Sequence, residues 1–189
     1  MWVLRRILPL AFVLALGACK RAEPEPAPRP CVEPDAGAAV DPALLGFLSA
    51  ARSAHHKADL LEQNADLAGA GRALEELLTG AKPAGKHLEV NEVLSDTHAR
   101  LADLYSRQGQ MAQAERSIAA GLELAQEPTY FQGHLYEVRG LMEERHAEAL
   151  GKAGKTGDAK QARERALSAF EEAMRIQKQV IEGAAPGRP

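Results

Sequence analysis

The sequence predicts an all-α protein whose helices form three antiparallel pairs. Alanine, leucine, glutamate and arginine dominate its 189 residues, and aromatic residues make up only 4%. This composition favours helices over strands. Apolar residues recur at three-to-four spacing in six segments, and glycine or proline separates the segments. With 46% hydrophobic and 26% charged residues, the chain is typical of a folded domain rather than a disordered one.

The first residues have the pattern of an export signal. Arg5 and Arg6 precede an apolar run over residues 7–16. A helix needs about twenty apolar residues to span a bilayer, so this run is too short to be a transmembrane segment. The run ends in Leu16, Gly17, Ala18 and Cys19.

That ending resembles a bacterial lipobox, in which an aliphatic residue and two small residues precede a cysteine. The resemblance implies that residues 1–18 are a lipoprotein signal peptide and that Cys19 carries the lipid. The thiolate of Cys19 would be the lipid-accepting nucleophile. Lys20, rather than aspartate, follows the cysteine; in enterobacterial lipoproteins this implies retention in the outer membrane, facing the periplasm. The alternative is an ordinary secretory signal with an incidental cysteine.

Residues 19–40 are predicted to be a lipidated, proline-rich linker. Five prolines lie between Lys20 and Val40, with few large apolar residues, so the segment is expected to form an extended tether rather than a core. If Cys19 is lipidated, Cys31 has no partner within the chain. It is then either unpaired or joined to another chain by a disulfide.

Helices are predicted in order through residues 41–182. Asp41 and Pro42 supply a helix start, and the first helix ends near Asn64. The second covers about 67–78 and is stopped by Gly80 and Pro83. The expected inward residues are Leu44, Leu45, Leu48, Ala51, Ala54, Ala58 and Leu61, then Ala70, Leu74, Leu77 and Leu78.

The remaining four helices follow the same pattern. The third begins near His87, the fourth covers 111–125, and Thr129 caps the fifth. A glycine-rich turn is predicted at 151–157, a sixth helix at about 158–181 and a disordered tail at 183–189. The expected inward residues are Val90, Val93, Leu94, Leu101, Leu104 and Tyr105; Ala114, Ile118, Leu122 and Ala125; Phe131, Leu135, Val138, Met142 and Ala149; and Ala162, Ala166, Phe170, Ala173, Met174 and Ile181.

Residues 95–128 resemble a tetratricopeptide repeat (TPR). The matching positions are His98, Leu101, Ala102, Tyr105, Ala114, Ile118 and Pro128. An earlier copy matches at Ala58, Leu61, Ala70, Leu74 and Pro83, and a looser later copy at Ala166, Phe170 and Ala173. The resemblance implies a short TPR-like α-solenoid over residues 41–182. A generic six-helix bundle is the alternative, since the first two copies are 44 residues apart rather than 34.

In such repeats the first helix of each pair lines the concave face. The outward positions there would form a mixed-charge groove able to bind a peptide or helix of a protein partner. A solvated charged helix face is the alternative. The lysine and asparagine slots of carboxylate-clamp repeats hold other residue types here, so C-terminal carboxylate recognition is not implied. The predicted partner-binding residues are Arg52, His55, His56, Asp59, Arg100, Asp103 and Arg107, with Glu62 and Asp96 beside them.

The sequence contains no pattern that predicts an enzyme. The adjacent histidines His55 and His56 would point about 100° apart on a helix, which is poor geometry for a metal site. The 151–156 turn lacks the spacing of a phosphate loop, and no serine or cysteine has a recognisable base. We therefore expect no catalytic residue, no metal, no cofactor and no small-molecule substrate. The net charge of -3 and the absence of a basic stripe argue against nucleic acid.

These observations together predict a membrane-anchored periplasmic adaptor or scaffold that binds a protein partner during assembly of an envelope complex. The membrane would be contacted through the lipid on Cys19. The alternative is a structural envelope lipoprotein that associates with itself and has no dedicated peptide groove.

Overall fold

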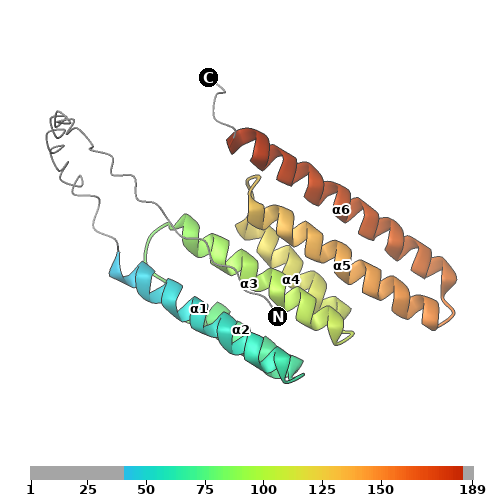
Figure 1. The fold of residues 1–189 in the computed structure, drawn as a ribbon, viewed down its shortest axis with the longest axis horizontal. Helices are drawn as coiled ribbons and strands as arrows, with labels where there is room; N and C mark the ends of the chain where they lie inside the picture. The colour runs from blue at the N-terminus through green and yellow to red at the C-terminus, as the bar shows by residue number, and fades with distance from the viewer. Residues whose placement is uncertain (1–40, 185–189) are drawn as a thin grey trace, which may run out of the picture. The chain divides into compact units, whose positions relative to one another are not determined.

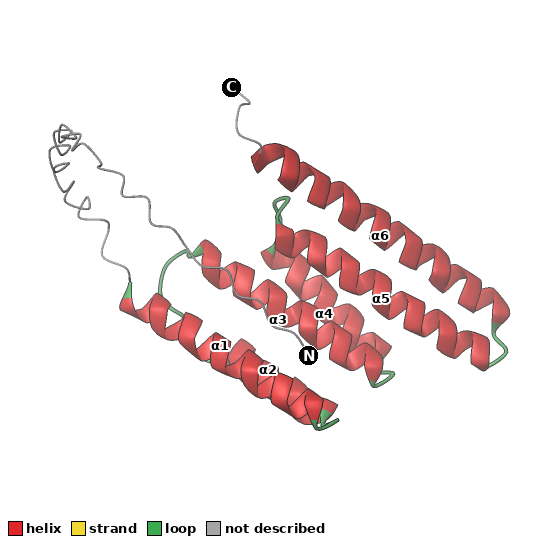
Figure 2. Cartoon of the chain, in the orientation of Figure 1, coloured by secondary structure: helices red, strands yellow, loops and turns green. Residues whose placement is uncertain are grey.

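The computed structural model describes residues 41–184, which form six α-helices and no strand (Figure 2). The predicted all-α class is therefore confirmed for this range. The signal peptide, the linker with Cys19 and Cys31, and residues 185–189 lie outside the described residues. The helices are α1 (Pro42–Gln63), α2 (Leu67–Thr79), α3 (Leu88–Arg107), α4 (Met111–Leu124), α5 (Tyr130–Lys152) and α6 (Thr156–Ala184).

Side-chain caps fix several helix starts where the sequence placed them. The carboxylate of Asp41 accepts a hydrogen bond from the backbone N–H of Ala43 at 2.8 Å, and Pro42 occupies the first helical position. The hydroxyl of Thr129 accepts from the N–H of Gln132 at 3.2 Å. Each cap satisfies a backbone donor that the helix leaves free, so the predicted starts of α1 and α5 are confirmed.

The last turn and the last helix differ from the prediction. Helix α5 continues to Lys152 and α6 begins at Thr156, so the predicted turn at 151–157 shortens to 153–155. Gly154 in this turn has φ +75°, a backbone conformation that a residue with a Cβ rarely adopts. Helix α6 also extends to Ala184, which places residues 183 and 184 in the helix rather than in the tail.

The helices of residues 41–184 form three antiparallel pairs (Figure 1). Short turns at 64–66, 108–110 and 153–155 join the members of each pair. Helix α3 packs on both α1 and α2, and α5 packs on both α3 and α4. Helix α6 packs on α5 and on no other helix among the described residues.

Large aliphatic side chains hold neighbouring pairs together. Leu101 and Leu104 of α3 are buried against α1 and α2, next to Leu74. Ile118, Leu135 and Met142 are fully buried; with Ala99, Ala102 and Ala114 of α3 and α4 they make one cluster that joins the second pair to the third. Burial of each such side chain stabilises the fold by about 1.5–3 kcal/mol.

Helix α6 uses small residues against α5 instead. Five alanines on one face of α6 are buried, and Gly133 and Gly140 of α5 lie close to this helix. Small residues at a helix contact allow the two backbones to approach closely. The buried alanines are Ala159, Ala162, Ala166, Ala169 and Ala173.

Four residues predicted to point inward are exposed. Leu45 is 53% exposed because the buried face of α1 is set by Phe47, Ala51 and Ala58. The side chains of Met174 and Ile181 are 62% and 70% exposed, because the alanine face of α6 turns toward α5 and leaves them beside it. The fourth is Ala149, near the C-terminal end of α5.

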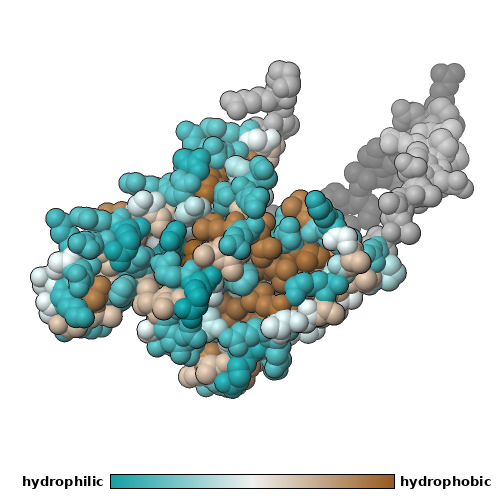
Figure 3. Space-filling view, turned by 180° about the vertical axis from the view of Figure 1, so that it is seen from behind, coloured by the Kyte–Doolittle hydropathy of each residue, from teal (hydrophilic) through white to brown (hydrophobic). Residues whose placement is uncertain are grey.

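The opposite face of the molecule from that in Figure 1 exposes apolar side chains at its centre, surrounded by polar ones (Figure 3). No helix among residues 41–184 combines the length and the apolar character needed to cross a bilayer.

His98 of α3 is half-buried, and its buried Nδ1 has no hydrogen-bond partner among the described residues. Burial lowers the pKa of His98 below its ordinary value. The unfolded chain therefore binds a proton at His98 more readily than the folded chain does. The stabilising contribution is present above the ordinary histidine pKa and is lost as pH falls toward the folded pKa.

We accordingly expect the melting temperature of the chain to fall between pH 7.5 and pH 5, and to fall less in a His98→Leu variant. Each unit of difference between the folded and unfolded pKa values costs about 1.4 kcal/mol. Thermal unfolding followed by circular dichroism at several pH values measures this. The prediction is contradicted if both proteins show the same dependence on pH.

Candidate functional site

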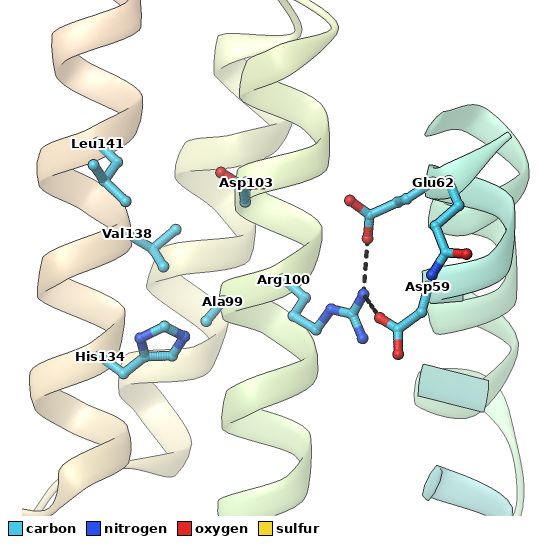
Figure 4. A pocket seen from close by; sticks show the side chains of 9 residues that line it. Asp59, Glu62, Ala99, Arg100, Asp103, His134, Val138 and Leu141 are labelled. Atoms are coloured by element: carbon cyan, nitrogen blue, oxygen red, sulfur yellow. Dashed lines mark hydrogen bonds and ion pairs between the residues drawn. The ribbon is translucent and has the colours of Figure 1, made fainter. Parts of the chain in front are cut away.

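The first helices of the three pairs, α1, α3 and α5, line an open cavity of about 630 Å³ (Figure 4). Its floor is apolar: Ala99 of α3 and Val138 of α5 are buried there, and Leu141 of α5 is 37% exposed. Polar side chains surround this floor. They are Asp59, Glu62 and Gln63 from α1, Arg100 and Asp103 from α3, and His134 from α5.

Ion pairs connect α3 to α1 along one wall of the cavity. Nη2 of Arg100 lies 2.7 Å from Oδ1 of Asp59 and 2.7 Å from Oε1 of Glu62 (Figure 4). Nη1 of Arg107 donates to the other oxygen of Glu62 at 2.6 Å. Glu62 therefore accepts from two guanidinium groups, and both arginines are held in place before any partner arrives.

Asp103 extends the same network from α3 to α5. Its Oδ1 accepts from Nη2 of Arg145 at 2.5 Å, and its Oδ2 lies 3.4 Å from Nη1 of Arg107. Arg145 also donates to the hydroxyl of Ser106 at 2.5 Å. Charged groups on all three helices thus form one continuous chain of pairs.

The pairing affects the acidity of Asp59. Removal from water acts to raise the pKa of its carboxyl, but the charge and hydrogen bond of Arg100 outweigh this and lower the pKa. Asp59 is therefore ionised at neutral pH.

The opposite end of the cavity region holds two histidines around one carboxylate. Nδ1 of His55 lies 3.7 Å from Asp96, and Nε2 of His134 lies 3.9 Å from the other oxygen of Asp96. Nε2 of His55 also hydrogen-bonds Oγ1 of Thr97 at 3.0 Å. Burial is the main cause that lowers the pKa of His55, and nearby Arg100 adds to it against the pull of Asp96. His55 is therefore neutral at pH 7.

The structure brings together part of the predicted partner-binding set. Asp59, Arg100 and Asp103 line the cavity, while Arg107 lies beside it and supports Glu62. His55 is not among the lining residues, and its ring contacts Thr97 and Arg100 of α3. Arg52 and His56 are exposed on α1 outside the cavity.

The sequence interpretation missed the contribution of α5. It assigned Val138 to the core only, and it named neither Leu141 nor Arg145 as site residues. The spacing of four residues in the sequence could have identified this face of α5. They recur every three to four positions on the first helix of the third pair: His134, Val138, Leu141 and Arg145. The adjacent histidines of α1 have different surroundings, since His55 faces α3 and His56 lies 3.5 Å from Asp59.

The lining combines charged groups with apolar ones. Each charged group has an ion-pair partner among the described residues, and no serine, cysteine or lysine is among the residues that line the cavity. Within residues 41–184 no three histidine, cysteine or acidic side chains are grouped to hold a metal ion. An apolar floor between fixed charges is typical of a surface that receives an apolar side chain and orients it through polar contacts.

Comparisons with protein-family models, with curated proteins and with solved structures give no match to this chain.

Proposed function

We propose that this protein is a lipid-anchored periplasmic adaptor of the TPR type, which holds a segment of a protein partner in the cavity between α1, α3 and α5. The observation that carries the proposal is the composition of that cavity. It combines an apolar floor with prearranged charges on both walls, and it is open to solvent along three helices.

The way in which the helix pairs pack supports the TPR interpretation. The first helix of each later pair contacts both helices of the pair before it, so the three first helices lie side by side as successive repeats require. Residues at the matching positions are also buried where the pattern needs small or aliphatic side chains. These are Leu101, Ala102, Ala114 and Ile118, each at most 2% exposed.

The distribution of charge suggests the chemistry of the partner. Arg100, Arg107 and Arg145 neutralise the carboxylates at one end of the cavity region. At the other end Asp96 and Glu137 have only histidines as ion-pair partners among the described residues. A segment with an apolar side chain for the floor and a lysine or arginine for Asp96 and Glu137 would match both features.

The anchor is the second part of the proposal. A lipid on Cys19 would hold the chain at the membrane, because each buried methylene contributes about 0.8 kcal/mol. The proline-rich segment would then hold the cavity at a distance from the bilayer surface. At that distance an extended envelope protein can reach the cavity.

Photo-crosslinking in cells tests both parts. A photoreactive residue in place of Gln63 on α1, or in place of Leu141 on the cavity floor, is expected to capture the same partner chain. The same residue in place of Arg72, which is exposed on α2 outside the cavity, serves as the matched control. Peptide mapping of the product is expected to find an apolar residue next to a basic one.

Two further variants are expected to lose one part of this result each. Leu141→Glu is expected to abolish capture from position 63, because an apolar side chain bound on the cavity floor would remove the new carboxylate from water without a partner. Cys19→Ser is expected to move the captured complex from the membrane fraction to the soluble fraction. Equal capture from positions 63 and 72 would overturn the cavity assignment, and unchanged fractionation of Cys19→Ser would overturn the anchor.

A further inference from the structure

The outer side of α6 carries a line of exposed apolar side chains. Leu167, Met174 and Ile181 are 63%, 62% and 70% exposed, although each lies next to the buried alanine face. The three residues are seven positions apart, so they follow one side of the helix. We refer to them as the α6 line.

The place of α6 in the fold explains why this line is uncovered. The open edge of the first pair is covered by α3, and that of the second pair by α5. No helix among residues 41–184 covers α6 on its outer side (Figure 1). The α6 line is thus at the edge where the packing rule of this fold would place another helix.

The groove between α5 and α6 beside the line is already filled. A Cβ on Gly140 of α5 would lie 2.6 Å from the ring of Phe170, which shows that this ring is seated on the α5 backbone. Phe170 therefore belongs to the packing within the pair. The α6 line itself stays exposed and has no covering helix among residues 41–184.

The spacing of the line matches pairing with another helix. An apolar residue at every seventh position stays on one side of a helix that winds left-handedly around a neighbour. Apolar residues on such a seam are flanked by charges that select the partner and its direction. Here Glu171 and Lys178 lie four positions after Leu167 and Met174, on the exposed flank of the line.

These flanking charges are complementary to those of a second copy of the same helix. If two copies pair antiparallel about Met174, Leu167 meets Ile181 of the partner subunit. Glu171 then lies beside Lys178 of the partner subunit, and the symmetry repeats this contact. Glu171 has no ion-pair partner among the described residues, and Lys178 has only a 3.9 Å contact with Glu182. In a parallel pair, Glu171 would instead lie level with Glu171 of the partner subunit, and Lys178 level with Lys178 of the partner subunit.

We propose that the protein forms a two-fold dimer through antiparallel pairing of α6 with α6 of a second copy, centred on Met174. The dimer leaves the α1/α3/α5 cavity of each copy open, since α6 lies on the far side of α5 from α3.

Cysteine crosslinking in the full-length chain, with Cys19 and Cys31 replaced by serine and in mild detergent, tests the geometry. Met174→Cys is expected to crosslink to itself, because the two copies of this position meet on the axis. Leu167→Cys is expected to crosslink with Ile181→Cys in a mixture of the two variants, and not with itself. Failure of Met174→Cys to crosslink, or self-crosslinking of Leu167→Cys at an equal rate, would overturn the proposal.

A charge substitution provides an independent measurement. Met174→Glu is expected to weaken dimerisation in sedimentation equilibrium by about tenfold or more, because it places two carboxylates on the axis. Leu60→Glu on α1 is the matched control, since Leu60 is 61% exposed and lies outside the line. A dimer that survives Met174→Glu, or one that Leu60→Glu disrupts equally, would contradict the assignment. Helix content by circular dichroism verifies that both variants are folded.

Discussion

Replacing Gly121 by valine is expected to destabilise the helical domain by about 3 kcal/mol, the upper part of the range for overpacking a tight helix contact. Gly121 is the point on α4 where α3 and α5 both approach. A Cβ there would lie 2.6 Å from Cδ2 of Leu135 and 3.1 Å from Cβ of His98. Leu135 is fully buried and the Cβ of His98 is fixed to its backbone, so neither group can move aside without shifting a helix.

Gly46 of α1 supplies the matched control for this variant. It is also a helical glycine, but nothing lies within 4 Å of the position that its Cβ would take. Gly46→Val is expected to change stability by less than about 0.5 kcal/mol, because valine and glycine differ little in helix propensity. Urea unfolding of both variants makes the comparison, and equal stabilities would show that the three helices do not cross closely at Gly121.

Removing the guanidinium of Arg165 is expected to be the second large effect. Glu143 of α5 is only 5% exposed and accepts two hydrogen bonds from Arg165 of α6, at 2.6 Å and 2.9 Å. The hydrogen bond to Glu143 also raises the pKa of Arg165. Arg165→Met leaves the carboxylate buried without this partner and is expected to cost about 2–3 kcal/mol. We expect less than for a fully buried pair because the side chain of Arg165 is 51% exposed.

Two comparisons distinguish the effect of burial on stability from the effect of the number of hydrogen bonds. Arg175 also donates two hydrogen bonds to one carboxylate, that of Glu172, but the side chains of Arg175 and Glu172 are 54% and 34% exposed. Arg175→Met is therefore expected to cost less than about 1 kcal/mol. The double variant Glu143→Met with Arg165→Met is expected to recover most of the loss, since well-packed apolar groups replace buried pairs at little cost. Urea unfolding measures the stability of each variant. An equal loss of stability in Arg165→Met and Arg175→Met would show that burial of the Glu143 carboxylate is not the cause of the loss.

The sequence predicted the helices well because their signals are local. The cap at Asp41 and the stop at Gly80 act within one turn of the residues that carry them, so spacing alone located α1 and α2. The end of α5 was less predictable, since Gly151 is tolerated within a helix that packs on α6. The exposed positions of Leu45 and Ile181 were also not predictable from spacing, because an apolar residue at the edge of a stripe can face either side.

The candidate site was only partly predictable for a related reason. The sequence identified α1 and α3 as charged faces, and three of the residues it named, Asp59, Arg100 and Asp103, line the cavity in the structure. It predicted a mixed-charge groove without assigning pairs between these charges, whereas Arg100 of α3 reaches Asp59 and Glu62 of α1. Pairs 38 and 41 residues apart in the chain depend on how α1 and α3 pack, which no local pattern encodes.

For residues 41–184 the sequence by itself determined the all-α class, the number of helices and most of their limits, because hydrogen bonding within a helix and its caps depend on neighbouring residues. Only the tertiary structure decided which charges meet across α1, α3 and α5, that Leu141 and Arg145 belong to the site, and that the α6 line is exposed. The physical reason is that these properties arise from burial and close approach between helices, and both depend on packing over the whole domain.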